Sequence, residues 1–324
     1  MLSVEQAIKA ARLFPEKRKT MPILGTISVN GRVEATDLET WYSAVVSNSA
    51  LNGCYEIADL ALYPTVTPRP ARKLEEFPTR PDHGVKPSNR LELGQLLSEL
   101  ERCLPFASDD PTRYNINGLY FETDRIVATD GHSLIVSEIP HGLDNVILSK
   151  DGCKKLAKWL KMRRLTEGKD AGVHISWNDA LVTFNLPATG ETVTLRKVDG
   201  QYPDYRQVIP ADSFQVVALG LQQKNCKLDT SSLVKVSKRT NDSRDPAIKL
   251  TKDQAGVTYK SPAIPQYVVC PSEPAPFTIG FSARLLSRCL DAIQSRELLL
   301  TSEYGPAIIR NGRIQAIIMP MRFE

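Results

Sequence analysis

The 324-residue sequence lacks the long apolar runs of a membrane protein. No apolar stretch approaches the roughly 20 residues that a helix needs to span a bilayer, so we expect no membrane partner. Residues 1–5 also lack the basic start and apolar core of a signal peptide. These absences favour a cytoplasmic protein.

Clustered metal ligands and paired cysteines are missing as well. The six cysteines are far apart without a Cys-x-x-Cys pair, and the four histidines are equally scattered. Cys103, Cys153 and Cys289 have the helical spacing of an apolar face, where a free thiol packs as a small hydrophobic group. We therefore expect reduced, buried thiols, no disulfide framework, no metal and no cofactor.

Catalytic motifs are also absent. The sequence has no serine or cysteine nucleophile in a recognisable elbow and no phosphate-binding glycine loop. Asp130 and His132 can be interpreted as an acid–base pair, although such a spacing is common by chance. A binding protein is favoured over an enzyme, and a nuclease assay with a substituted Asp130 would separate the two.

Charge is nearly balanced overall, at +4, but it is unevenly distributed. Residues 150–164 contain seven lysines and arginines and a single carboxylate, Asp151. A basic stripe on a nearly neutral body is typical of a protein that binds a polyanion.

The chain contains an internal repeat. Residues 22–37 align without a gap over residues 115–130, a shift of 93 positions. Six of the sixteen positions are identical, and both copies end in Ala-Thr-Asp. Each copy follows a segment with helical apolar spacing, and each predicts two short strands joined by a turn, at Asn30-Gly31 and at Thr123-Asp124.

A second pattern, one helix followed by strands, occurs twice. The first predicts a helix over 150–164, with Cys153, Leu156, Ala157 and Leu160 on its apolar face. The second predicts a helix over 282–295. The strands expected after the two helices are 172–177, 180–186 and 191–197, then 297–301, 306–310 and 313–319.

Two proline-rich stretches interrupt the chain, with six prolines in 64–88 and five in 262–276. The first indicates a domain boundary or a surface arm, and the second a loop inside the last domain. The sequence therefore predicts an α+β protein of three similar domains, 1–87, 88–208 and 209–324, with helices packed on antiparallel sheets.

Several segments together resemble one family, the bacterial DNA polymerase III beta subunit or sliding clamp. The matches occur in the family's order and are weakest over 45–88 and 211–276. They are residues 21–25 (MPILG), 36–39 (TDLE), 113–122 (RYNINGLYFE), 127–134 (VATDGHSL), 198–205 (VDGQYPDY) and 319–323 (MPMRF).

The resemblance implies a ring. In that family two subunits join head to tail, each contributes three similar domains, helices line the central hole and sheets form the outside. It also implies the partners: double-stranded DNA bound without sequence specificity, a DNA polymerase, a clamp loader and other proteins with a clamp-binding motif. The function expected is that of a processivity factor.

Two sets of residues would carry this function. Phosphate contacts from lysine and arginine bind DNA without reading its bases. By their charge or by the resemblance, the DNA-contacting set is Arg18, Tyr114, Lys150, Lys154, Lys158, Lys161, Arg284 and Arg288, with the four lysines expected to face outward. The alternative for any one of these side chains is a solvated surface position or a pair within a helix.

The resemblance also implies a groove for partner peptides between the second and third domains. Methionines there would form adaptable apolar walls, and Gly131 would allow a peptide backbone to approach closely. The groove residues carried over are Ile116, Thr129, Gly131, His132, Ser133, Leu134, Pro203, Gln207, Val208, Ile317, Met319, Pro320, Met321 and Arg322. The alternative for the Met-Pro-Met segment is a terminal strand that caps a core.

The sequence departs from the family at three places. Clamps commonly have arginine where Ser133 and Gln207 stand, and the tail is extended by Glu324. The first domain is short, with about forty residues after its hairpin. A compact clamp of this kind suggests a phage or mobile element, and the short domain keeps open an alternative: a clamp-fold protein that binds a polymerase or a host clamp without encircling DNA.

Overall fold

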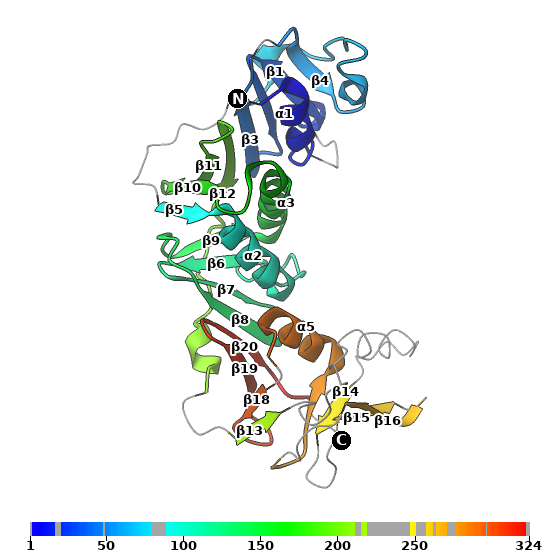
Figure 1. The fold of residues 1–324 in the computed structure, drawn as a ribbon, viewed down its shortest axis with the longest axis vertical. Coiled ribbons are helices and arrows are strands. Elements are labelled where there is room, and N and C mark those ends of the chain that lie inside the picture. Colours follow the sequence, from blue (N-terminus) through cyan, green and yellow to red (C-terminus); the bar gives the residue numbers. More distant parts are fainter. Residues whose placement is uncertain are drawn as a thin grey trace. The chain divides into compact units, whose positions relative to one another are not determined.

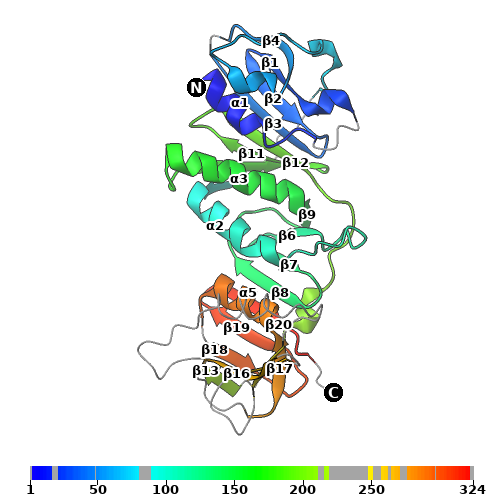
Figure 2. The same ribbon diagram turned by 90° about the vertical axis from the view of Figure 1, so that its right-hand side faces the viewer.

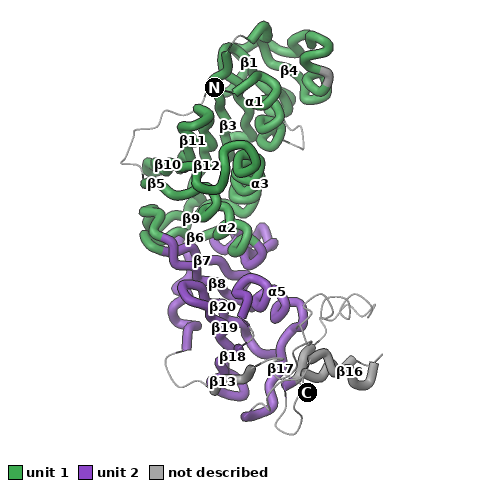
Figure 3. The backbone as a smooth tube through the Cα atoms, viewed as in Figure 1, with its two compact units in different colours: residues 1–104, 118–124, 140–200 green, residues 105–117, 125–139, 201–324 purple. Residues whose placement is uncertain are grey.

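The computed structural model describes residues 2–16, 21–47, 49–79, 89–210, 215–218, 247–250, 257–261, 264–270, 276–295 and 297–321. The chain divides into two compact units (Figure 3). Unit 1 consists of residues 1–104, 118–124 and 140–200, and unit 2 of residues 105–117, 125–139 and 201–324. Secondary structure is α+β, with antiparallel sheets, as predicted. The predicted domain boundaries near 87 and 209 stay predictions.

Unit 1 is built on an eight-stranded antiparallel sheet (Figure 2). Its strand order is β4-β1-β2-β3-β12-β11-β10-β5, so strands from the two ends of unit 1 pair at β3 and β12. The bounds are β1 Thr26–Asn30, β2 Arg32–Thr36, β3 Thr40–Val45, β4 Asn52–Glu56, β5 Asn89–Glu92, β10 Gly172–Trp177, β11 Leu181–Leu186 and β12 Glu191–Arg196.

The described residues of this unit form three α-helices: α1 Val4–Ala11, α2 Leu93–Cys103 and α3 Lys150–Glu167. Ser3 begins α1 with a capping box, in which Ser3 and Gln6 exchange side-chain bonds to backbone amides. α2 buries Leu93, Leu96 and Leu97 at helical spacing and packs against α3. The apolar face predicted for the helix at 150–164 is buried.

The structural repeat includes strands outside the two segments, 22–37 and 115–130, that align in sequence. β2 and β3 correspond, at the same shift of 93 residues, to β7 Arg125–Thr129 and β8 Ser133–Glu138. β6 Gly118–Glu122 and β9 Val146–Ser149, which pair with each other in unit 1, match β1 and β4 to within one residue. A duplicated strand pattern therefore accompanies the duplicated Ala-Thr-Asp segment.

Unit 2 contains α5 Ala283–Ile293, which packs on β8, β17, β19 and β20 (Figure 1). Within this unit one antiparallel sheet has the order β13-β18-β19-β20-β8-β7, and the other has the order β16-β15-β14-β17. The remaining bounds are β13 Gln215–Ala218, β14 Ala247–Leu250, β15 Val257–Ser261, β16 Ile264–Cys270, β17 Ile279–Ser282, β18 Glu297–Leu300, β19 Ala307–Asn311 and β20 Ile314–Ile318.

The two proline-rich stretches differ in structure. The loop predicted over 262–276 is wrong in part, because β16 occupies Ile264–Cys270. β16 lies at the edge of its sheet, where proline is tolerated because its missing N–H group can face away from the ladder. In the other stretch, the residues described up to 79 form irregular structure and a short 3-10 helix, Leu74–Glu76.

Candidate functional site

A tight turn between β7 and β8 forms the centre of a pocket in unit 2. The Thr129 hydroxyl donates to the Ser133 carbonyl (2.8 Å) and accepts from the Gly131 amide (3.0 Å). Oδ1 of Asp130 accepts from the backbone amides of His132 (2.9 Å) and Ser133 (2.8 Å). Side chains thus satisfy the backbone of a three-residue loop that would otherwise have unpaired amides.

Glycine is favoured at position 131 of this turn for two reasons. Its φ of +90° lies in the left-handed region that other residues adopt at a cost. A Cβ atom there would also lie 2.9 Å from a terminal nitrogen of Arg113. The Arg113 guanidinium, which donates to the Asp130 carbonyl (3.2 Å), therefore lies directly against the turn.

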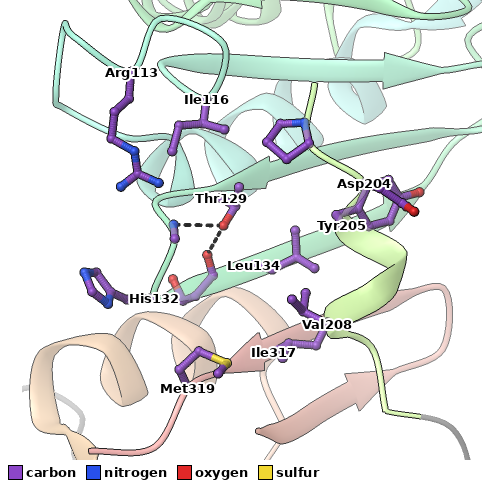
Figure 4. A pocket seen from close by; sticks show the side chains of 13 residues that line it. Arg113, Ile116, Thr129, His132, Leu134, Asp204, Tyr205, Val208, Ile317 and Met319 are labelled. Carbon is purple, nitrogen blue, oxygen red and sulfur yellow. Dashed lines mark hydrogen bonds between the residues drawn. The ribbon is translucent and has the colours of Figure 1, made fainter. Parts of the chain in front are cut away.

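Apolar side chains form the other walls of the pocket (Figure 4). Leu134 of β8 and Ile317 of β20 are register partners and are almost fully buried. Val208 and Met319 are 44% and 39% exposed, which is high for large apolar side chains. Apolar walls with a few polar groups at the edge are the usual composition of a peptide or small-molecule site.

The pocket has a volume of about 220 Å³. It brings together ten of the fourteen groove residues expected from the sequence. These are Ile116, Thr129, Gly131, His132, Ser133, Leu134, Pro203, Val208, Ile317 and Met319. Whether they bind a peptide stays a prediction.

Three expected residues that the structure describes do not line it. Gln207 instead donates from its side chain to Asp204 (3.1 Å), which precedes the 3-10 helix Tyr205–Val208. Met321 bonds through its backbone to Gly280 (2.7 Å), a bridge that fits the terminal-strand alternative. Pro320 is not among the lining residues, and Arg322 is outside the described residues.

Three lining residues were missed: Arg113, Asp204 and Tyr205. All three lie inside segments that resemble the clamp family, 113–122 and 198–205. The signal was therefore available in the sequence, but only as membership of a matching segment. The side-chain direction of Arg113 depends on a turn whose Ile116 amide bonds back to the Arg113 carbonyl (3.0 Å).

Arg288 of α5 binds the back of the same turn. It donates to Oδ2 of Asp130 (2.6 Å), to the hydroxyl of Ser133 and to the carbonyl of Pro105 (2.8 Å). Its guanidinium carbon also lies 4.8 Å from the ring centroid of Phe106. The expectation that Arg288 faces DNA is therefore wrong, because its planar fork of donors is engaged inside unit 2.

The pKa of the Asp130 carboxyl reflects these contacts. Burial raises the pKa of its carboxyl, but the charge and hydrogen bond of Arg288 and the two turn amides outweigh burial and lower the pKa below its usual value. The interpretation of Asp130 and His132 as an acid–base pair loses its basis, since Asp130 bonds to the backbone of His132 and to Arg288.

The basic helix is less exposed than predicted. Lys154, Lys158 and Lys161 face solvent, and Lys161 lies 3.4 Å from Glu101. Lys150 is buried, so the expectation that it faces outward is wrong. It occupies the first turn, where Ser149 caps the helix through Gly152 and Gly152 packs closely against Leu195 of the sheet.

Two further cations of this helix also point inward. Lys155 binds Oδ2 of Asp37, and Arg163 donates to Glu191 (2.7 Å). Both bury their charge against a carboxylate, as buried cations generally must. The remaining DNA candidates differ in their setting: Arg284 and Tyr114 are exposed, and Arg18 lies outside the described residues.

The described part of the chain has no helix long and apolar enough to cross a bilayer. Within the same ranges, histidines, cysteines and carboxylates nowhere gather as three potential metal ligands. Cys103, Cys153 and Cys289 are free, buried thiols, and burial raises the pKa of each.

Comparison with known proteins gives a consistent result, although no family model matches the chain. The beta sliding clamp of Caulobacter vibrioides is 27% identical over 268 residues, which cover 76% of this chain and 69% of the relative. The beta sliding clamp of Proteus mirabilis is also 27% identical, and the match covers 94% of each protein.

Solved structures match along nearly the whole chain. DNA polymerase III beta of Caulobacter crescentus superposes with a TM-score of 0.81, at 20% identity, over 99% of this chain and 98% of that one. A sliding clamp of Bartonella birtlesii bound to griselimycin superposes with a TM-score of 0.79, at 23% identity, over 98% and 97%. The sequence relatives and the shared fold agree, and the chain is similar to beta sliding clamps along nearly its whole length.

Proposed function

We propose that this protein is a DNA sliding clamp, which encircles duplex DNA without sequence specificity and tethers a replicative DNA polymerase. Two chains would join head to tail, each with three clamp domains, and a loader would open the ring. The similarity to beta sliding clamps over 94% of the chain supports this role most directly.

The pocket in unit 2 is the proposed site for partner peptides. Its lining comes from residues 113–134, from 203–208 and from 317–319, on both sides of the predicted boundary at 209. Partly exposed apolar walls with a few polar side chains among them suit a short peptide with apolar side chains. The ionisable side chains of its lining are Arg113, His132 and Asp204, while Ser133 and Gln207 supply no cation.

The DNA-facing element would be α3. Lys154, Lys158 and Lys161 recur at four and then three residues, so they lie along one side of the helix. Contacts from lysine to phosphate neutralise charge without reading sequence, as sliding requires. Arg284 of α5 adds an exposed cation from unit 2.

Retention on circular DNA tests the ring. The protein is loaded onto a nicked circular plasmid, and the complex is separated from free protein by gel filtration before and after the plasmid is cut once. A ring stays on the circle at salt that removes loosely bound protein and slides off after cutting. Equal retention on circular and linear DNA would contradict encirclement.

Deleting residues 319–324 tests the pocket. The deletion removes the Met319 wall and the amide that bonds to the His132 carbonyl (3.0 Å), so polymerase stimulation should be lost while the circular dichroism spectrum is kept. Full stimulation by the shortened chain would refute the assignment.

A second candidate is a clamp-fold protein that binds a polymerase or another clamp without encircling DNA. The short first domain favours it, because the described residues 57–79 after β4 contain two 3-10 helices of four and three residues and no α-helix. Sedimentation at micromolar concentration separates the candidates: a dimer supports the ring, and a strict monomer supports the second candidate.

A further inference from the structure

The chain holds two copies of one ionic contact. At the β2–β3 turn, Oδ1 of Asp37 accepts from the turn amides, including that of Thr40 (2.7 Å), while Oδ2 binds Lys155. At the β7–β8 turn, Oδ1 of Asp130 accepts from the turn amides and Oδ2 binds Arg288. In both copies one carboxylate joins a tight turn to a helix. We call these contacts the first latch (Asp37–Lys155) and the second latch (Asp130–Arg288).

Each latch cation occupies the same place on its helix. Lys155 lies six residues after Ser149, which caps α3 by accepting from the Gly152 amide (3.1 Å). Arg288 lies six residues after Ser282, which caps α5 by accepting from the Leu285 amide (3.4 Å). The residue that begins the following strand also contributes in both copies, since Lys155 bonds to the Thr40 hydroxyl (3.3 Å) and Arg288 to the Ser133 hydroxyl.

The two latches differ in whether the residues of their turn line a pocket. Thr129, Gly131, His132 and Ser133 of the second turn line the pocket of about 220 Å³. Arg288 itself lies outside that lining, and its extra bonds to Pro105 and over Phe106 fix its guanidinium from the other side. It therefore acts on the pocket only through the turn.

We propose that Arg288 is a positioning residue for partner peptides: it holds the Asp130–Ser133 turn in the shape that the peptide pocket requires. The inference rests on the proposed function of that pocket. A wall that is ordered before binding spares the complex the entropic cost of ordering it, so loss of the latch weakens affinity without removing a peptide contact.

The first latch is the matched control. K155M removes an equivalent contact at an equivalent helix position, from a turn that does not contribute to the described pocket. A general effect of lost helix anchoring should therefore appear in K155M and R288M alike. An effect on peptide affinity should appear in R288M alone.

The experiment uses the full-length chain and griselimycin as the probe. Affinity is measured by titration calorimetry for wild type, R288M, R288K and K155M, with urea unfolding and amide hydrogen exchange of residues 131–133 measured on the same samples. R288M should bind about tenfold more weakly and exchange those amides faster, whereas K155M should bind within about twofold of wild type. R288K should recover part of the affinity, because lysine restores the charge but not the planar fork.

Each outcome decides one point. Wild-type affinity in R288M, or an equal loss in K155M, overturns the positioning role. Failure of the wild type to bind griselimycin and to be retained on circular DNA overturns the proposed function instead, and with it the peptide part of the inference. Unchanged exchange of residues 131–133 in R288M shows that the latch does not hold the turn.

Discussion

Helices α3 and α5 carry the same capped start and the same latch position, yet they anchor differently. α3 adds a second ionic contact: Arg163 and Glu191 have side chains 3% and 0% exposed, and Tyr42 and Trp159 also bond to Glu191. α5 depends on Arg288, whose side chain is 20% exposed and lies behind a pocket. The comparison teaches that the second ionic anchor of α3 is fully buried, whereas the anchor of α5 stays partly exposed behind a pocket.

The largest effect should come from breaking the deeper anchor of α3. R163M leaves Glu191 charged and buried without its partner, which costs about 3–5 kcal/mol in the free energy of unfolding. Urea unfolding of full-length protein measures it. The matched variant R196M breaks the Arg196–Glu39 pair, whose side chains are 49% and 66% exposed, and should change stability by less than about 1 kcal/mol. Similar losses in both variants would remove the distinction between the helices.

Charge reversal on the solvent side of α3 tests its second role. K154E/K158E should shorten retention on circular DNA and lower the salt slope of DNA binding by about 2, because each lysine–phosphate contact contributes about 0.9. Binding is measured at several salt concentrations. K73E/R310E makes the same change in net charge at exposed positions elsewhere and should leave the slope near its wild-type value. If the two double variants behave alike, α3 does not contact DNA.

Low pH should weaken the second latch. Because the folded-state pKa of Asp130 is lowered, its contribution to stability is complete above the ordinary value near 3.9 and is lost as pH falls through the folded-state pKa. In D130N this part of the pH dependence should disappear, so the difference in stability between wild type and D130N narrows below about pH 4. Urea unfolding across that range measures the difference, and a constant difference would show that Asp130 is not the titrating group.

The smallest effect concerns the middle residue of each turn. Leu38 has a φ of 72° where Gly131 has 90°. G131A should destabilise by about 1–2 kcal/mol, since alanine is strained there and its Cβ meets Arg113. L38G should change stability by about 0.5 kcal/mol or less, because relief of strain offsets the entropy that glycine adds to the unfolded chain. Thermal unfolding measures both, and equal shifts would contradict a difference between the turns.

Periodicity and repetition in the sequence predicted much of this fold. The helices at 150–164 and 282–295 and the six strands after them are present within a few residues, because a 3.6-residue or two-residue apolar pattern reports which face is buried. β3, β4, β5, β8, β9, β13, β14, β15, β16 and β17 were not predicted as strands. β16 contains Pro265, and only its place at a sheet edge makes that residue acceptable.

Cation partners were the main feature that the sequence could not predict. Lys155 and Arg163 share the buried side of α3 with apolar residues, and their partners Asp37 and Glu191 lie 118 and 28 residues away. Spacing along one helix cannot identify such partners, so a basic segment was interpreted as a basic surface. Most pocket residues were found because they belong to segments that resemble a family, a signal that requires no knowledge of side-chain contacts.

The six-residue interval between each helix cap and its latch has a mechanical consequence. An α-helix rises about 1.5 Å per residue, so the two fixed points are about 9 Å apart along the axis. Two fixed points define the direction of a rod, and the second also fixes its rotation, because a slip of one residue turns the latch side chain by about 100°. A serine cap and a cation six residues later therefore fix both the residue at which a helix begins and the side of the helix that faces the sheet.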